Sequence, residues 1–393
     1  MNKITFIVLK KELKDMFRDK KTLFVSILIP LLMMPILFGV MGKSVNKSMK
    51  SAQENVKIVL QDKGNSSFAE FISKKENIKV VESQKPEEDV KNGKIALALE
   101  IPEDFEKTIK DEKVSKLKIT YDNSTQSSLT AFTIVNSYIE EYSKSVVQQR
   151  LDKRQINTEL LNPIVPEVIT AVKDNEGKGI FMISLLLPLF LVIYSVTGPM
   201  APATDLGAGE KERGTLEPLL STQAGRLSIL WGKFLAITVM GVITTVASLV
   251  GVIIAMTQND GLFGNTSGVN LPIGTILLIA LVSILVTMVF GALELAISIY
   301  ARSFKEAQTY LTPLMVIAFI PAYSSYMSDA KNISTMTFNI PIVNAVSLIK
   351  EFLVGIYNPV HMLLTFGWII IYIIASILFA RYMFSREEVI FRT

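Results

Sequence analysis

Long uncharged apolar segments alternate with short charged segments along most of the chain. A bilayer core about 30 Å thick is crossed by about 20 apolar residues in a helix. Five segments have this length, and they are Thr22–Gly42, Gly179–Thr204, Phe234–Asn259, Leu271–Ile299 and Phe352–Ala380. A sixth segment, Ala307–Ser328, is uncharged but contains two prolines and several hydroxyl side chains. The pattern predicts a mainly α-helical, polytopic membrane protein with six transmembrane helices, the first at 22–42 and the others within 179–393.

Between the last two predicted spans, residues 333–351 are rich in isoleucine but too interrupted to form a seventh. We expect an outer re-entrant or interfacial region there, because irregular backbone at membrane depth must be covered by protein. Lys350 and Glu351 would then pair with each other or reach toward the interface. His361, the single histidine of the chain, would lie at the interface as well.

The first 21 residues have a helical stripe of apolar side chains. Phe6, Leu9, Leu13, Met16 and Phe17 recur at this spacing, with basic residues between them. Residues 1–21 are therefore expected to form an amphipathic helix in the membrane interface. The alternative is a solvated, positively charged flank.

Residues 43–178 have the pattern of a water-facing domain. Short strands are indicated at 56–60, 78–81, 95–101 and 117–121, with helical segments between them. A long helix without glycine or proline follows at Ser128–Leu151. The order β-α-β-α-β-(α)-β-α predicts a small α/β domain with a mixed sheet. The segment 257–270 is expected to be a flexible connection on the same side.

Charge determines the expected orientation. Segments 1–21, 201–233, 300–309 and 381–393 together carry sixteen basic and ten acidic residues. The short segment 258–270 has no basic residue. Since lysine and arginine are enriched in cytoplasmic loops, both termini should be cytoplasmic and residues 43–178 extracytoplasmic. The net charge of +4 then reflects topology, and nucleic acid is not an expected partner.

Composition excludes several kinds of chemistry. The chain has 393 residues, of which 50% are hydrophobic, and no cysteine. Disulfides, iron–sulfur clusters and thiolate catalysis are therefore excluded. One histidine cannot make a histidine-rich metal site, so no metal site is expected.

The charged segment 205–222 lies between two predicted spans. Gly209 and Gly214 have the spacing of a phosphate loop, but Thr215 stands where that motif requires lysine. ATP hydrolysis by this chain is therefore not expected. Thr215 could instead cap a short helix whose leucines share one face and fit a partner's groove. A solvated membrane flank is the alternative.

The same segment resembles the coupling helix of ABC-2 type permeases, in which alternating charges precede Gly-Thr-Leu-Glu-x-Leu-Leu. The matching residues are Glu210, Lys211, Glu212, Arg213, Gly214, Thr215, Leu216, Glu217, Leu219 and Leu220. A proline usual near Gln223 is missing. Residues 1–21 resemble the family's connecting helix, and 340–355 its outer re-entrant region. The stretch with Arg302, Lys305 and Glu306 resembles its second cytoplasmic contact.

This resemblance implies a non-catalytic permease subunit of the bacterial cytoplasmic membrane that binds no cofactor itself. ATP and magnesium would lie on a cytoplasmic ABC ATP-binding subunit, and a second permease copy and membrane lipid would be the other partners. Residues 89–93 and 101–105 resemble those of the NatB-type sodium-efflux permeases, which implies sodium as cargo and a NatA-like ATPase. Export of drugs, lipids or peptides remains an alternative.

Glu294 lies inside a predicted span, where a carboxylate is costly and usually functional. It could form an ion path with Ser298 and Thr287, because hard cations prefer oxygen ligands. It could instead pair with Arg302 or with the first cytoplasmic helix.

Two functions from other classes remain open at this stage. A non-transporting sensor or assembly factor would use the outer domain to bind a ligand. An ion-coupled secondary transporter would need more intramembrane carboxylates and an inverted repeat, neither of which is evident.

Overall fold

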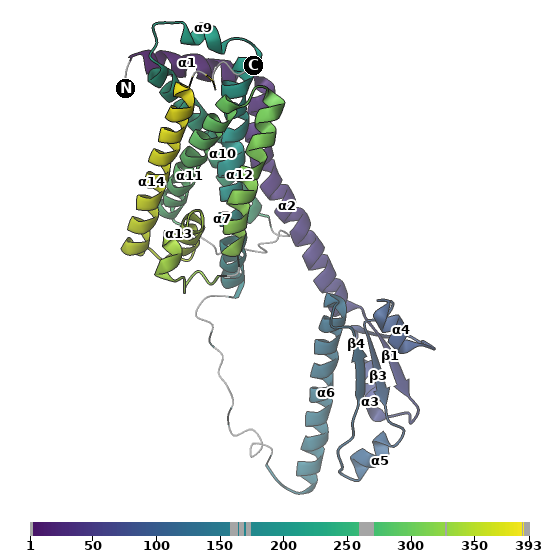
Figure 1. Ribbon diagram of the computed structural model, residues 1–393. Coiled ribbons are helices and arrows are strands. Elements are labelled where there is room, and N and C mark those ends of the chain that lie inside the picture. Colours follow the sequence, from purple (N-terminus) through teal and green to yellow (C-terminus); the bar gives the residue numbers. More distant parts are fainter. Residues whose placement is uncertain are drawn as a thin grey trace. The chain divides into compact units, whose positions relative to one another are not determined.

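The computed structural model describes residues 3–157, 164, 169, 174–258, 271–326, 328–386 and 388 (Figure 1). Most of the segment 257–270 and part of 158–173 therefore lie outside the described residues. The chain forms two compact units. We call Met1–Gly42 with Ala171–Thr393 the membrane unit, and Lys43–Thr170 the α/β unit.

The membrane unit consists of helices with loops between them. Five helices are long and apolar enough to cross a bilayer within the described residues. They are α2 (Lys20–Glu54), α7 (Asp174–Thr204), α10 (Arg226–Met256), α11 (Ile273–Tyr300) and α14 (Pro359–Ser385). The sixth predicted span is also a helix, α12 (Phe304–Ser324), with prolines at 313 and 321. It is not among the five, so its crossing of the membrane stays a prediction.

Helix α11 packs against α7, α10, α12 and α14. Small residues allow these close approaches, as is usual between membrane helices. A Cβ atom on Gly241 of α10 would overlap the Thr287 side chain of α11. A Cβ atom on Gly291 of α11 would lie 3.1 Å from Ile237 of α10.

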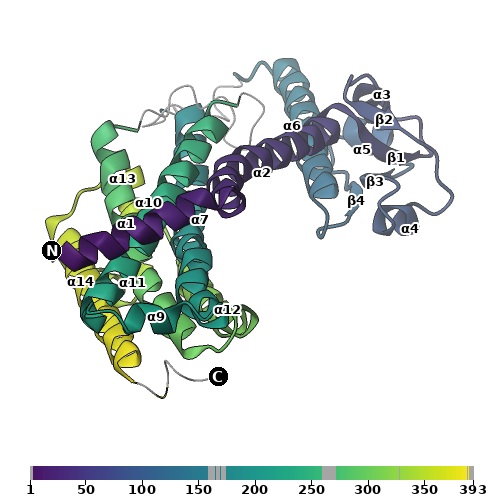
Figure 2. The same ribbon diagram turned by 90° about the horizontal axis from the view of Figure 1, so that it is seen from above.

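The remaining short helices lie at opposite ends of the membrane unit (Figure 1). Helix α1 (Lys3–Arg18) and α9 (Leu216–Leu220) lie at one end, and α13 (Val343–Leu353) lies at the other. Seen from above, α1 crosses the ends of the other helices (Figure 2). It buries Val8, Glu12 and Met16, one helical turn apart, and packs against α10. We call these two ends the α1 end and the α13 end.

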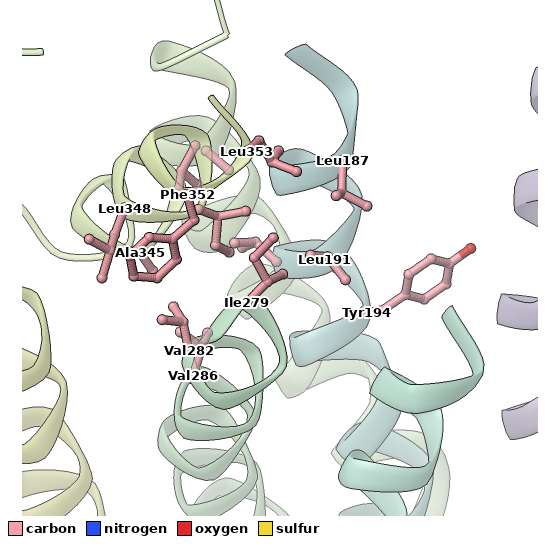
Figure 3. Close-up of a cluster of buried hydrophobic side chains, with 14 of the residues drawn as sticks. Leu187, Leu191, Tyr194, Ile279, Val282, Val286, Ala345, Leu348, Phe352 and Leu353 are labelled. Atoms are coloured by element: carbon pink, nitrogen blue, oxygen red, sulfur yellow. The ribbon is translucent and has the colours of Figure 1, made fainter. Parts of the chain in front are cut away.

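Helix α13 is buried along its whole length. Its apolar face, with Ala345, Leu348 and Phe352, lies against Ile279 and Val282 of α11 and against α7 (Figure 3). Protein therefore covers this short helix, as a re-entrant segment requires.

Two predicted boundaries were wrong. Phe352–Ala380 is not one span, because Phe352 belongs to α13 and the chain turns at Gly355, whose φ of +79° favours glycine. Proline then begins α14 at position 359, where its missing N–H costs nothing. Helix α10 begins at Arg226, well before Phe234, and includes Lys233.

The α/β unit has the order of elements that the sequence pattern predicts. Its sheet has the order β2-β1-β3-β4, with β1 parallel to β2 and β3, and β4 antiparallel to β3. The strands are β1 (Val56–Asp62), β2 (Ile78–Val80), β3 (Leu97–Ile101) and β4 (Lys118–Tyr121). The helices are α3 (Ser67–Ser73), α4 (Pro86–Lys91), α5 (Phe105–Lys110) and α6 (Gln126–Lys153).

Apolar side chains alternate between the two faces of the sheet, so this unit has a hydrophobic core on each face. Ile58, Leu97 and Leu99 pack with α3, α5 and α6, whereas Val59 and Ala98 pack with Val90 of α4. A mixed sheet covered in this way is the α/β architecture that the sequence predicts.

Candidate functional site

The charged segment after α7 is helical but irregular. Helix α7 continues through a π-helical turn, η2 (Asp205–Gly209), into the single turn α8 (Glu210–Glu212). A Cβ atom on Gly207 would overlap the side chain of Ser298 in α11. Instead, the Ser298 hydroxyl accepts a hydrogen bond from the Ala208 N–H at 3.0 Å and donates to the Thr204 carbonyl at 3.2 Å. The π turn is therefore seated directly on α11.

Glu210 belongs to a cluster of four charged side chains, three of them buried, which we call the charge quartet. Lys233 of α10 is fully buried, and its Nζ lies 2.5 Å from Glu210 Oε2 and 3.4 Å from Glu12 Oε1. It also donates to the Leu206 carbonyl at 3.1 Å. Lys11 of α1 lies 3.1 Å from Glu210 Oε1 and 3.2 Å from Glu12 Oε1. The quartet thus joins α1, α8 and α10 with balanced charge.

Burial around Lys11 works to lower the pKa of its ammonium group. The nearby carboxylates of Glu210 and Glu12 outweigh this effect and hold that pKa above its ordinary value. Lys11 is therefore charged at neutral pH.

The next residues join this segment to the loop between α11 and α12. Lys211 Nζ donates to the carbonyls of Ile299 at 2.5 Å and Ala301 at 3.3 Å. Glu212 Oε2 accepts a hydrogen bond from the Phe304 N–H at 2.8 Å. The two segments expected to contact a partner are therefore linked directly to each other.

Hydrogen bonds within the loop between α11 and α12 cap the first turn of α12. Ser303 accepts a hydrogen bond from the Glu306 N–H at 3.2 Å, and Glu306 Oε2 accepts one from the Arg302 N–H at 2.8 Å. This reciprocal pattern fixes the start of α12. The side chains of Arg302 and Lys305 remain exposed.

The leucine face of helix α9 is not presented to a partner's groove, contrary to the prediction. Leu216 is buried, and Leu219 and Leu220 pack against the core of the membrane unit at the α1 end. The leucine face therefore points into the chain itself, where burial is most favourable. Thr215 does not cap α9 with its side chain; its hydroxyl donates to the Glu210 carbonyl at 3.2 Å.

The polar side of this segment is left at the surface. Glu212, Arg213, Glu217 and Pro218 are exposed. A hydrogen bond from Arg213 to Asp205 raises the pKa of the arginine and orients it over the π turn. We call these four residues together with Arg302 and Lys305 the docking surface.

Glu294 is fully buried in α11, and neither of its oxygens has a hydrogen-bond partner in the described part of the chain. The expected pair with Arg302 is therefore not formed. Ser298 and Thr287 lie four residues after and seven residues before Glu294 on α11, and both are buried. Their hydroxyls already bond to backbone, Ser298 to Thr204 and Thr287 to Ser283.

At the α13 end, the expected pair is not formed. Lys350 and Glu351 do not bond to each other, and both they and His361 are buried within the protein. Lys350 Nζ donates to the carbonyls of Ser325, Tyr326 and Ser328, which follow the last turn of α12. Glu351 bonds to His361 instead.

Sequence reasoning missed Glu12, Lys11 and Lys233, although two signals were present. Glu12 occupies a buried position between Val8 and Met16 on the stripe of α1. A carboxylate at such a position needs a cation. Lys233 follows Trp231 at the start of an apolar run, where an unpaired ammonium would be costly.

The comparisons with known proteins agree with this architecture. The family model described as "ABC-2 family transporter protein" matches residues 20–382. The chain belongs to the ABC-2 transporter family. It is 30% identical over 390 residues to the "ABC transporter permease protein NatB" of Bacillus subtilis (strain 168), covering 97% of this chain and 98% of the relative.

As an ABC-2 permease, the chain is the membrane-spanning part of an ABC transporter. No group of three or more His, Cys, Asp or Glu side chains that could hold a metal ion occurs among its described residues. The arrangement at the α1 end instead joins a surface to several helices. Such a device can transmit movement.

Proposed function

We propose that this ABC-2 permease exports its cargo using ATP that a separate, cytoplasmic ABC ATP-binding subunit hydrolyses. The observation that carries the proposal is the docking surface, whose two segments are joined through Glu212 and Lys211. A subunit that pushes on this surface would move α7 and α12 together. Through the charge quartet, α1 and α10 would follow.

The proposed assembly follows from the family. Two permease copies, surrounded by lipid of the bacterial cytoplasmic membrane, enclose a path between them. Two NatA-like subunits bind ATP and magnesium and sit at the α1 end, which is cytoplasmic in this proposal, as are both termini. The α/β unit is then extracytoplasmic.

Sodium is the proposed cargo. The resemblance to NatB-type permeases and the 30% identity to NatB over nearly the whole chain support it. Glu294 supports it too, because a buried carboxylate without a hydrogen-bond partner favours a cation. Drugs, lipids or peptides are the alternative cargo.

Reconstitution tests this proposal. The permease and its cognate ATPase are placed in liposomes, and ATP-dependent sodium flux is measured. We expect flux with ATP and none without it. If a drug, lipid or peptide stimulates ATP hydrolysis while no sodium flux is measured, the alternative cargo is assigned.

The docking surface is tested by the exposed substitutions Glu217→Lys and Arg302→Glu. Because neither side chain is buried, the permease should fold normally but lose stimulation of the ATPase. Lys63→Glu, an exposed residue of the α/β unit, is the matched control. Normal stimulation in both surface variants would contradict the assigned role.

Glu294→Gln tests the ion path separately. The amide keeps the shape of the side chain but removes the charge. We expect sodium flux to fall at least tenfold, about 1.4 kcal/mol, while ATPase binding is retained. Unchanged flux would remove Glu294 from the path.

A further inference from the structure

One side of α13, about a quarter turn from its apolar face, carries polar side chains. Asn344, Ser347 and Glu351 follow one another at spacings of three and four residues, which places them along one side of the helix. All three are buried. Polar groups in such positions normally have partners.

Glu351 is the last residue of this row along α13, and its side chain contacts α14. Its Oε1 lies 2.7 Å from His361 Nδ1. His361 Nε2 lies 3.1 Å from the hydroxyl of Thr335, and the Phe338 ring stacks on the imidazole with centroids 3.9 Å apart. Thr335 and Phe338 belong to the short 3-10 helix η3 (Thr335–Asn339). The imidazole is therefore fixed from three sides.

Several buried polar atoms beside this chain of contacts lack hydrogen-bond partners among the described residues. They are Glu351 Oε2, Ser347 Oγ and Asn344 Nδ2 on α13, and Thr365 Oγ1 on α14. Glu351 is 3% exposed, and Ser347 and Thr365 are 0% exposed. Water outside the protein therefore does not solvate these atoms.

Two observations, together with helical spacing, place these residues on the sides of α13 and α14 that face each other. Glu351 meets His361 in the first turn of α14, whereas Asn344 lines a pocket with Ile369 and Ser376, further along α14. The two helices thus run in opposite directions where they meet. Ser347 lies one turn before Glu351, and Thr365 lies one turn after His361, so helical spacing puts both hydroxyls between the Glu351–His361 bond and that pocket.

In the tautomer in which His361 donates from Nδ1 to Glu351 and accepts at Nε2 from Thr335, the imidazole is neutral and the interface carries the negative charge of the Glu351 carboxylate. Lys350 does not neutralise it, because its ammonium is bonded to the three carbonyls after α12. A buried carboxylate of this kind needs a cation or a proton.

We propose that the α13–α14 interface binds a small alkali cation, Na⁺ or Li⁺, through Glu351 Oε2 and the hydroxyls of Ser347 and Thr365. Oxygen ligands suit hard cations. One carboxylate balances one positive charge, which favours a monovalent ion over a divalent one. The site is separate from Glu294 on α11 and does not depend on transport or on an ATPase.

Protons compete with the cation at this site. Burial raises the pKa of the Glu351 carboxyl, although the hydrogen bond from His361 opposes this effect. The carboxyl is therefore protonated at a higher pH than usual. Affinity for the cation should fall as pH falls, because the protonated carboxyl carries no charge.

The chain contains a natural reporter for the site. Trp368 lies one turn beyond Thr365 on α14, and its indole N–H donates to Asn339 Oδ1 of η3 at 3.0 Å. Trp231, the other tryptophan of the chain, lies in α10. The variant Trp231→Phe of the full-length protein therefore reports from Trp368 alone. Its fluorescence is titrated with NaCl against choline chloride at constant ionic strength.

We expect a saturable response to Na⁺ and Li⁺ that choline does not produce. Glu351→Gln should abolish it. Ser347→Ala and Thr365→Val should each weaken binding about tenfold, the size expected for losing one oxygen contact to a charged group. Thr365→Val keeps the shape of the side chain, so it tests binding even if Glu351→Gln does not fold.

Two controls separate this site from others. Ser376→Ala, a buried hydroxyl further along α14, should leave the titration unchanged. Glu294→Gln should leave it unchanged as well, even if that variant no longer transports sodium.

Three outcomes would overturn the proposal. The titration could be the same in Glu351→Gln and Thr365→Val as in the parent protein. Choline could produce the same response as Na⁺, which would report ionic strength. The fluorescence could follow pH but not Na⁺, which would identify a site for a proton instead.

Discussion

Lys233 is a fully buried ammonium group whose contacts come from three different segments of the chain. Taking an ion out of water costs several kcal/mol unless partners compensate. Glu210, Glu12 and the Leu206 carbonyl provide that compensation. Separating α1, α8 and α10 would leave charges unpaired, so these elements are expected to move as one body.

Lys233→Met should destabilise the permease by about 3 kcal/mol, since removing one member of a buried ion pair leaves the others uncompensated. Unfolding by a denaturing detergent measures this change. Adding Glu210→Gln should restore part of the loss. Arg213→Gln is the control, because the Arg213–Asp205 pair is about half exposed and such pairs contribute less than about 1 kcal/mol. Equal losses in both single variants would contradict this argument.

The π turn η2 is the element that connects the docking surface to the membrane helices. It requires a glycine at 207, because any side chain there would overlap Ser298. Gly207→Val should therefore push the end of α7 away from α11 and lower the unfolding midpoint. Gly225→Ala is the control, since nothing lies within 4 Å of a Cβ atom at that position. A Gly207 variant as stable as the control would show that the contact is adjustable.

The turn between α8 and α9 depends on Gly214, whose φ is +65°. Valine strains this conformation, whereas asparagine tolerates it. Gly214→Val should uncouple ATP hydrolysis from efflux in the reconstituted system, while the protein remains in the membrane. Gly214→Asn should retain at least half of the coupled activity. Loss of coupling in both variants would show that a side chain at this surface, not the backbone, is responsible.

The elements differ in how well the sequence predicted them. The period and length of the apolar segments located α7, α11 and the order of elements in the α/β unit. They could do so because a helix that buries one stripe, or a strand that buries one face, leaves a pattern in the local sequence. The inward leucines of α9 could not be predicted, since a five-residue helix has the same pattern whether it faces its own chain or a partner. The pairs Lys233–Glu210 and Glu351–His361 join different helices, and local spacing carries no information about them.

At the scale of the whole membrane unit, the two ends differ in how their buried polar and charged groups are partnered. The α1 end has paired charges and an exposed docking surface. The α13 end has a buried row of polar atoms with unused bonding capacity. This division suits a transporter in which one end receives a mechanical input and the other binds an ion.

That interpretation requires the α1 end to be cytoplasmic and the α/β unit to be on the other side. The chain has no cysteine, so single cysteines can be labelled without background. Val114 in the α/β unit is 88% exposed, and Gln223 after α9 is exposed. In intact cells, a membrane-impermeant maleimide should label Val114→Cys but not Gln223→Cys. After permeabilisation both should react equally. The reverse pattern would place the docking surface outside the cell, where no ATPase could reach it.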